Sequence, residues 1–332
     1  MAKRIFFDVV TVGSATLDVF ASAAANEIII RENGEEEEFI AYESGTKILI
    51  KELDFFIGGG GTNTACSFSR LGLKTGFIGK LGNDENGKHI LSMLKKSRVE
   101  FLGAIDKRHK SGYSIVLDSE DDRTILTHKG ANDYLSYKDT RLDQIKTKWL
   151  YFASMTHKAY KTLEKMALFA KKNSIKLAFN PSSYIAKLGK EYLSKVIKRT
   201  NVLILNKEEA SLILGKKGRL KSLLGSLSAL GPEVVVITDG KNGCYAKHGS
   251  SYFYLPAKKT RVKDTTGAGD AFASGFIAGI IKGKGIEDSL KIGMANASSV
   301  ITHVGAKNGL LSYSQAVARA RKMRLAGFPH KA

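Results

Sequence analysis

Short apolar segments alternate with amphipathic segments along most of the chain. Apolar runs of strand length lie at 7–13, 75–79, 149–153, 175–180, 202–206 and 234–238. Apolar positions recur with helical spacing at 62–71, 85–96, 158–172, 220–230, 268–282, 286–302 and 313–324. Buried strands that alternate with helices are typical of parallel βαβ units. We therefore expect one α/β domain over residues 1–332, with a doubly wound, mostly parallel sheet and helices on both faces.

Two segments, 27–57 and 110–128, do not follow this alternation. The first has an apolar run before Asn33-Gly34, a dipeptide typical of hairpin turns, and a second apolar stretch up to Ile57. The second has two strand-like runs separated by an acidic turn. We expect these segments to pair as a small antiparallel β lid over the site. One face of such a lid stays apolar and exposed unless a partner covers it, so the pattern also favours a homodimer through the lid.

Charge and cysteine content limit the classes of function. The chain has 52 Lys and Arg against 32 Asp and Glu, a formal net charge of +20, and the basic residues are spread along its length. Because no zinc-finger spacing or aromatic RNA-binding motif accompanies them, nucleic acid is not expected as the main ligand. No apolar run reaches the ~18 residues of a membrane span, and Cys66 and Cys244 lack metal-ligand spacing. A cytoplasmic protein without a membrane partner is expected.

The most informative motif is Asp264-Thr265-Thr266-Gly267-Ala268-Gly269-Asp270, at the start of a helical segment. Glycines there let backbone N–H groups turn toward an anion, and the helix dipole adds positive charge at the same point. Asp270, in the first helical turn, could accept a proton from a substrate hydroxyl. No Gly-Lys-Ser/Thr follows, so the motif is not a Walker A loop. It indicates phosphoryl transfer, although Gly and Asp at this place can also serve only as caps.

Three further sets of polar residues stand at expected strand ends, where ligands of open α/β sheets bind. The run Gly58–Gly61, followed by Asn63, allows backbone to approach a ligand closely, or forms a plain tight turn. It lacks GxGxxG spacing, which argues against a dinucleotide-dependent oxidoreductase. Glu209 could hold Mg²⁺ through water, or Asn206 and the acidic residues after it could simply start a helix. Asp18 could bind sugar hydroxyls or cap a loop.

Together these motifs resemble the two signatures of the ribokinase, or PfkB, family of carbohydrate kinases. The first signature matches from Gly58 through Gly72 and again at 79–87, and the second matches Asp264–Phe272 and Gly275-Phe276. Order and spacing agree, and the likeness covers almost the whole chain. The resemblance implies a ribokinase-like fold and an enzyme that transfers the γ-phosphoryl group of ATP to a hydroxyl of a sugar or nucleoside. It also implies a need for Mg²⁺ and, as in many members, K⁺.

The resemblance further implies roles for individual residues. Asp270 would be the catalytic base, and the backbone of Gly267, Ala268 and Gly269 would form an anion hole. The remaining implied residues are Asp18, Gly59, Gly60 and Asn63 for the acceptor; Asn206, Thr238, Gly240, Gly243 and Asn296 for the nucleotide; Glu209 for Mg²⁺ through water; and Asp264, Thr266 and Gly305 for a monovalent cation. The two hairpin segments match the family's lid, which often also forms a dimer contact.

The motifs do not identify the molecule that accepts the phosphoryl group. Family members often have Asn two residues before the first Asp and Lys within the first glycine motif, where this chain has Thr16 and Gly60. Ribose and a sugar phosphate held by that lysine are therefore not favoured. A nucleoside would need an aromatic wall, for which the candidates are Tyr42, Phe55, Phe56 and Tyr113. A sugar phosphate would need cations, for which the candidates are Arg123 and Lys129. A basic nucleic-acid-binding or regulatory protein on a kinase-like fold is the alternative from another class.

Overall fold

A nine-stranded sheet forms the centre of the molecule in the computed structural model, which describes residues 6–23, 26–32, 35–118 and 123–329. Its strand order is β17-β16-β15-β14-β13-β12-β1-β6-β8. The bounds are β1 (Phe6–Val12), β6 (Thr75–Ile78), β8 (Val99–Phe101), β12 (Lys146–Phe152), β13 (Lys176–Phe179), β14 (Val202–Asn206), β15 (Val234–Thr238), β16 (Cys244–His248) and β17 (Ser251–Leu255). All pairs from β15 to β8 are parallel, and β16 and β17 add an antiparallel edge.

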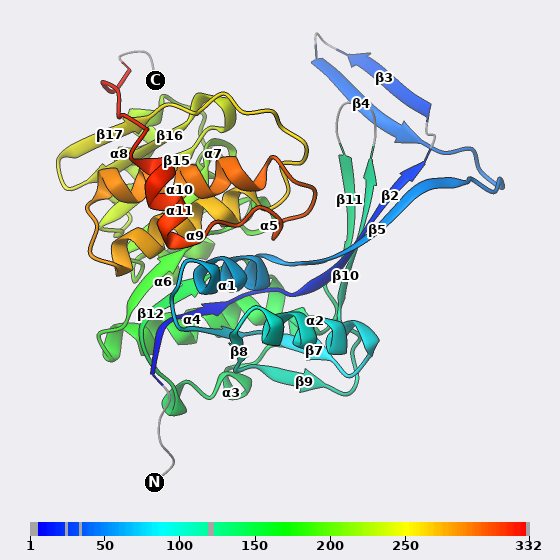
Figure 1. Cartoon of the computed structure of the whole chain (residues 1–332), viewed down its shortest axis with the longest axis horizontal. Helices are drawn as coiled ribbons and strands as arrows, with labels where there is room; N and C mark the ends of the chain where they lie inside the picture. Colours follow the sequence, from blue (N-terminus) through cyan, green and yellow to red (C-terminus); the bar gives the residue numbers. More distant parts are fainter. Residues whose placement is uncertain (1–5, 24–25, 33–34, 119–122, 330–332) are drawn as a thin grey trace.

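Helices cover both faces of this sheet (Figure 1). One face carries α4 (His157–Lys172), α5 (Ser183–Ala186), α6 (Gly189–Ile197), α7 (Lys207–Leu214) and α8 (Leu220–Ser228). The other carries α1 (Gly60–Arg70), α9 (Ala268–Ile281), α10 (Ile286–Val300) and α11 (Tyr313–Ala320). Side chains alternate along each strand, so Val10 and Val12 of β1 join the first core and Val9 joins the second. The doubly wound α/β fold class predicted from the sequence is confirmed.

Shorter elements connect these layers. They are α2 (Glu85–Lys96), β7 (Lys80–Gly82), β9 (Ala104–Asp106), the 3₁₀ turns η1 (Gly130–Tyr134), η2 (Leu142–Gln144) and η3 (Gly240–Asn242), and α3 (Tyr137–Thr140). Helix α2 has the bounds predicted from the sequence, because the Asp84 side chain accepts a hydrogen bond from the Gly87 N–H at 2.8 Å and caps its start.

A second sheet of four strands stands beside the main body, in the order β11-β10-β2-β5 (Figure 1). It consists of β2 (Thr16–Ala23), β5 (Ile50–Gly58), β10 (Gly112–Asp118) and β11 (Arg123–His128). The two predicted lid segments do meet here, but they are joined through β2, a strand that the sequence analysis did not predict. Strand β10 pairs in parallel with β2, so the sheet is mixed rather than purely antiparallel.

Part of the predicted lid lies elsewhere. Strands β3 (Asn26–Glu32) and β4 (Glu35–Ala41) form a two-stranded antiparallel sheet of their own, beyond the tip of the four-stranded one (Figure 1). The predicted turn at Asn33-Gly34 lies outside the described residues. We call the four-stranded sheet of β11, β10, β2 and β5 the lid sheet.

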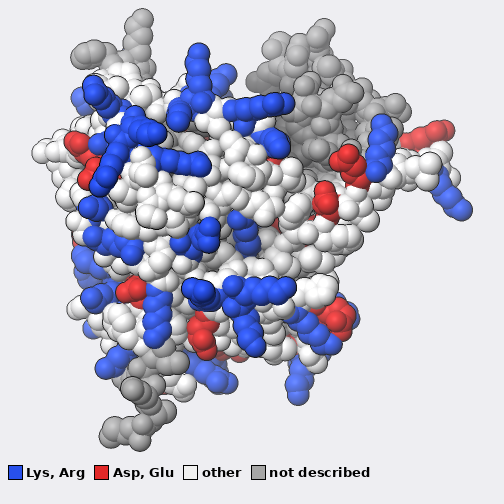
Figure 2. Space-filling view, viewed as in Figure 1, with Lys and Arg blue, Asp and Glu red and all other residues white. Residues whose placement is uncertain are grey.

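Basic side chains are scattered over the visible face of the molecule, with acidic ones between them (Figure 2). This distribution agrees with the even spread of Lys and Arg along the sequence. No helix in the described ranges is long and apolar enough to cross a membrane.

Candidate active site

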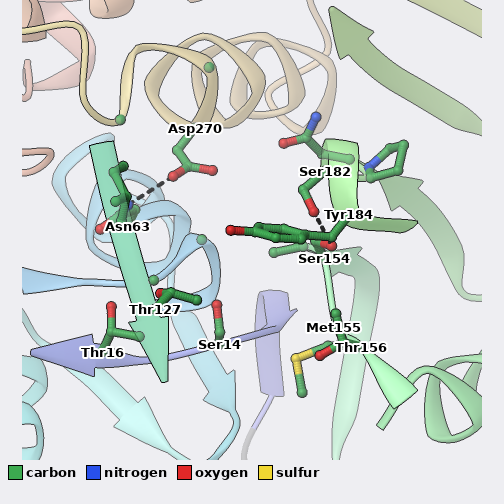
Figure 3. A pocket seen from close by; sticks show the side chains of 18 of the residues that line it. Ser14, Thr16, Asn63, Thr127, Ser154, Met155, Thr156, Ser182, Tyr184 and Asp270 are labelled. Atoms are coloured by element: carbon green, nitrogen blue, oxygen red, sulfur yellow. Dashed lines mark hydrogen bonds between the residues drawn. The ribbon is translucent and has the colours of Figure 1, made fainter. Parts of the chain in front are cut away.

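A pocket of about 410 Å³ lies where the parallel strands end. Ala153, Asn180, Asn206 and Thr238, which end or follow β12 to β15, form its floor, and lid-sheet residues such as Thr127 form one wall. The N-terminal end of α9 closes the remaining side (Figure 3). This volume suits a small-molecule ligand, and its position is the one where open α/β sheets bind ligands.

Asp270 points into this pocket from the first turn of α9 (Figure 3). Gly267 precedes the helix with φ 75°, and a Cβ added there would lie 2.4 Å from Ala306 Cβ, so only glycine fits this turn. Burial raises the pKa of the Asp270 carboxyl to about 6, although the hydrogen bond from Asn63 and the charge of Lys307 act in the opposite direction. Asn63 Nδ2 donates to Asp270 Oδ2 at 2.8 Å. A carboxylate with this pKa can act as a base near neutral pH.

The residues predicted for the acceptor lie on the same side of the pocket. Asp18 lines it from β2, and its Oδ1 is buried without a hydrogen-bond partner among the described residues. A Cβ on Gly58 would lie 1.6 Å from Asp18 Oδ2, so the absence of a side chain at Gly58 leaves room for this carboxylate. Gly59, with φ +89°, and Gly60, whose Cβ would lie 3.5 Å from Asp270 Oδ1, complete the wall. A buried acceptor atom without a partner is well suited to bind a ligand hydroxyl.

Asn206 and Glu209 line the pocket and also form the capping box at the start of α7. Asn206 Oδ1 accepts from the Glu209 N–H at 2.8 Å, and Glu209 Oε2 accepts from the Asn206 N–H at 2.9 Å. Burial raises the pKa of the Glu209 carboxyl to about 7. Asn206 and Glu209 therefore do cap the helix, as one of the two interpretations of the sequence predicted. The same arrangement places the Glu209 carboxyl at the pocket.

The predicted nucleotide loop follows β15. Thr238 lines the pocket, while Gly240 begins the turn η3 and Gly243 follows it, each with a positive φ. Asp239, the acidic residue of this loop, lies 3.6 Å from the Lys207 ammonium and accepts a hydrogen bond from Asn242 Nδ2 at 3.1 Å. Its charge is thus balanced within the protein.

The three residues predicted for a monovalent cation come together at the base of the α9 turn. Asp264 Oδ1 accepts from the Thr266 N–H at 2.8 Å and from Thr266 Oγ1 at 2.6 Å, and Asp264 Oδ2 accepts from the Gly305 N–H at 2.8 Å. Asp264 is 8% exposed. These bonds hold the loop after α10 against the glycine turn that precedes Asp270.

Two predicted site residues use their polar groups within the protein instead. Asn296 is fully buried; its Nδ2 donates to Ser67 Oγ and the Ala271 carbonyl, and its Oδ1 accepts from the Leu311 N–H. This side chain links α10 to α1 and α9 and is not available to a nucleotide in this structure. The Ala268 N–H, predicted for the anion hole, donates to the Thr265 carbonyl at 3.2 Å.

The structure also brings in residues that the sequence analysis missed. Tyr184 lines the pocket, and the Lys129 ammonium lies 4.8 Å from the centre of its ring. The aromatic candidates Tyr42, Phe55, Phe56 and Tyr113 are not among the residues that line it. Behind Asn63 lies Lys307, whose ammonium donates to the Ile57 carbonyl and to Asn63 Oδ1. No spacing pattern pairs these residues, because 244 positions separate Lys307 from Asn63.

A half-buried carboxylate at the glycine-rich start of a helix shares a small-molecule pocket with Asp18, whose Oδ1 has no hydrogen-bond partner among the described residues. This arrangement is typical of a phosphotransferase acting on a hydroxyl group. Comparison with known proteins agrees: the model of the pfkB family of carbohydrate kinases matches residues 23–312. The chain belongs to this family, and it is a kinase of the sugar and nucleoside class.

Relatives and solved structures support the assignment. An uncharacterized sugar kinase of Archaeoglobus fulgidus is 31% identical over 248 residues, covering 73% of this chain and 97% of the relative. The 5-dehydro-2-deoxygluconokinase of Bacillus licheniformis is 30% identical over 312 residues, covering 89% of this chain and 90% of the relative. The crystal structure of Methanocaldococcus jannaschii nucleoside kinase, an archaeal member of the ribokinase family, superposes with a TM-score of 0.75 at 23% identity, covering 95% of this chain and 98% of that one.

Proposed function

We propose that Asp270 is the base in the transfer of the γ-phosphoryl group of ATP to a hydroxyl of a small acidic sugar. The observation that carries this proposal is the position of Asp270, in the first turn of α9 and hydrogen-bonded to Asn63, facing the pocket that Asp18 also lines. In the reaction the acceptor oxygen forms a bond to the γ-phosphorus, the bond from that phosphorus to the β-bridging oxygen breaks, and the hydroxyl proton passes to Asp270.

The helix start supplies the stabilising charge. The N–H groups of Gly267 and Gly269, with the dipole of α9, would face the phosphoryl group in flight. A Cβ on Gly269 would meet nothing within 4 Å, which leaves its backbone open to the pocket. The Ala268 N–H is already used in the turn, so it contributes less than the sequence suggested.

The two cation sites follow from the same geometry. Glu209 presents a carboxyl to the pocket from the start of α7 and would hold Mg²⁺ through water. Mg²⁺, when bound, would neutralise negative charge on the nucleotide phosphates. The loop around Asp264, Thr266 and Gly305 would hold K⁺ beside the anion hole. Thr238, Gly240 and Gly243 would then contact the nucleotide beyond the strand ends.

The acceptor end of the pocket favours a sugar acid. Hydroxyl side chains of Thr16, Ser114 and Thr127 line it, which suits a ligand rich in hydroxyl groups. Lys129 also lines it; among the described residues no hydrogen bond or ion pair engages its ammonium, and burial lowers its pKa. A cation with these properties gains most from an anionic ligand. The relative from Bacillus licheniformis is named for such a sugar acid.

A nucleoside is the second candidate acceptor. Tyr184 lines the pocket and offers the one aromatic ring found among its described lining residues. A nucleobase could stack on this ring, at the place where the Lys129 ammonium lies now.

The lid sheet would close over the acceptor and join two copies of the chain. Its exposed apolar side chains include Ile50, Phe55 and Leu126, with exposures of 51%, 59% and 53%. An exposed apolar surface of this kind is typical of a protein–protein interface. We therefore propose a homodimer through the lid sheet.

A screen of acceptors tests the substrate class. The rate of ADP release is measured in a coupled assay with each candidate acceptor in turn. The candidates are pentoses, hexoses, their phosphates, nucleosides and sugar acids, including 5-dehydro-2-deoxygluconate. We expect the highest kcat/KM with a sugar acid. The Lys129→Met variant should then lose activity on the acid but not on its neutral analogue, and Lys158→Met, at another lysine that lies over a tyrosine ring, should lose neither. A nucleoside as the best acceptor would contradict the proposal.

A further inference from the structure

A single lysine outside the pocket wall connects three parts of the active site. Lys307 lies on the loop after α10, two residues beyond Gly305, and its ammonium donates to the Ile57 carbonyl near the end of β5 and to Asn63 Oδ1 on α1. Asn63 Nδ2 in turn donates to Asp270 Oδ2 at 2.8 Å (Figure 3). Hydrogen bonds therefore connect Lys307 to Asn63, and Asn63 to Asp270.

The loop that carries Lys307 is held firmly in place. The Gly305 N–H donates to Asp264 Oδ2 at 2.8 Å, and the Phe56 ring packs so closely that a Cβ on Gly305 would lie 2.9 Å from it. Ala306 packs against Gly267, the residue before α9. The position of Lys307 is thus fixed both by the lid strand β5 and by the glycine turn.

The donors and acceptors in this chain of contacts permit one orientation of the Asn63 amide. A lysine ammonium can only donate hydrogen bonds, so the amide oxygen of Asn63 must face Lys307. The amide NH₂ group is then left to face Asp270. In the opposite orientation the amide oxygen would face a carboxylate oxygen and the NH₂ group would face the ammonium, and both contacts would be repulsive.

We propose that Lys307 is a positioning residue for phosphoryl transfer: it fixes the Asn63 amide so that its NH₂ group holds the Asp270 carboxylate toward the acceptor. This inference rests on the proposed role of Asp270. Lys307 lies behind Asn63 and is not among the residues that line the pocket, so it would act through Asn63 and not on the acceptor itself.

Electrostatics support this role. Burial raises the pKa of Asp270, and the two influences that lower it are the Asn63 hydrogen bond and the Lys307 charge. The carboxylates of Asp18 and Asp270 and the thiol of Cys66 lie near the Lys307 ammonium. Burial and the nearby charge of Asp270 both raise the pKa of Glu209 and of Tyr151. Loss of the Lys307 charge should therefore make Asp270 harder to ionise.

The direct test is the titration of Asp270 in the ligand-free protein, which needs no acceptor. The carboxyl carbons of aspartate are labelled with ¹³C, and the Asp270 signal is identified by its loss in Asp270→Asn. We expect Lys307→Met to move the Asp270 titration upward by about one pH unit, because a nearby cation is removed. Lys284→Met, at an exposed lysine after α9, should leave it unchanged. An unchanged titration in Lys307→Met would overturn the proposal.

Kinetics with the best acceptor of the screen test the route through Asn63. Lys307→Met should lower kcat about 10–100-fold, and Lys307→Met combined with Asn63→Ala should be no slower than Asn63→Ala alone, within about threefold. Independent, multiplying losses would overturn the proposal, as would a rise in KM without loss of kcat, which indicates direct acceptor binding. If Lys307→Met does not fold, Lys307→Gln, which also lacks the charge, gives the same two measurements. An inactive wild type would contradict the proposed function but not the titration result.

Discussion

Replacing Asp270 by asparagine should stabilise the protein at neutral pH. Burial raises the pKa of this carboxyl from an ordinary value of 3.8 to about 6, so the fold favours its protonated form. Ionisation above pH ~6 then costs the folded state up to about 3 kcal/mol, at 1.36 kcal/mol for each pKa unit. Asp270 still faces the pocket water, and Lys307 loses a neighbouring charge in the variant, so we expect a gain of about 1–3 kcal/mol. Asparagine retains an oxygen for the Asn63 NH₂ group.

The sign of the pH dependence makes this prediction specific. A carboxyl with a raised pKa destabilises the fold at high pH, and the penalty disappears as pH falls from about 6 toward 3.8. Urea unfolding of wild type and Asp270→Asn at pH 7.5 and 4.5 measures it, with Asp143→Asn at an exposed site as the control. At pH 4.5 the gain should fall to about one third of its value at pH 7.5. A variant that is no more stable than wild type at pH 7.5, or equally stabilised at both pH values, would refute the reasoning.

Three further outcomes follow from the site. Turnover should require Mg²⁺ and rise with K⁺; equal rates in sodium, potassium and a large organic cation would remove the K⁺ site. Hydrogen exchange should slow in the lid sheet when acceptor and a nucleotide analogue bind together, and no added protection would contradict the closing of the lid sheet. Light scattering should give a dimer, and a monomer at all concentrations would contradict the dimer. Gly58→Ala should lower kcat/KM about 10–100-fold because its Cβ would lie 1.6 Å from Asp18 Oδ2, whereas Gly285→Ala, with nothing within 4 Å, should not.

Local sequence patterns were sufficient to predict most strands and helices of the central sheet and its two helical layers. The parallel strands are continuous apolar runs, and helices such as α2 carry their own caps, so their bounds could be predicted from neighbouring residues alone. The two motifs around Asn63 and Asp270 were found for the same reason. Each places its functional residue at a glycine-rich turn that starts a helix, which leaves a clear pattern in a short stretch of sequence.

Long-range pairing accounts for what was missed. Strand β2 was expected as a loop around Asp18, because Thr16–Ala23 becomes a strand only through its pairing with β5 and β10, far along the chain. The hydrogen bond between Asn63 and Asp270 spans 207 positions, and no pattern in either segment requires it. Asn296 was assigned to the nucleotide by resemblance, but its burial between α1, α9 and α10 could only be seen once these helices were packed together.

The central claim is that Asp270 takes the proton of the acceptor hydroxyl. It is tested most directly by comparing phosphoryl transfer and ATP binding in wild type and Asp270→Asn, with the acceptor that the screen identifies. Loss of a general base costs about 10²–10⁴-fold in turnover, whereas the contacts of ATP with the nucleotide loop stay intact. We expect a fall in kcat of that size with little change in the Kd for ATP. Near-normal turnover in Asp270→Asn would show that another group takes the proton and would contradict the assignment.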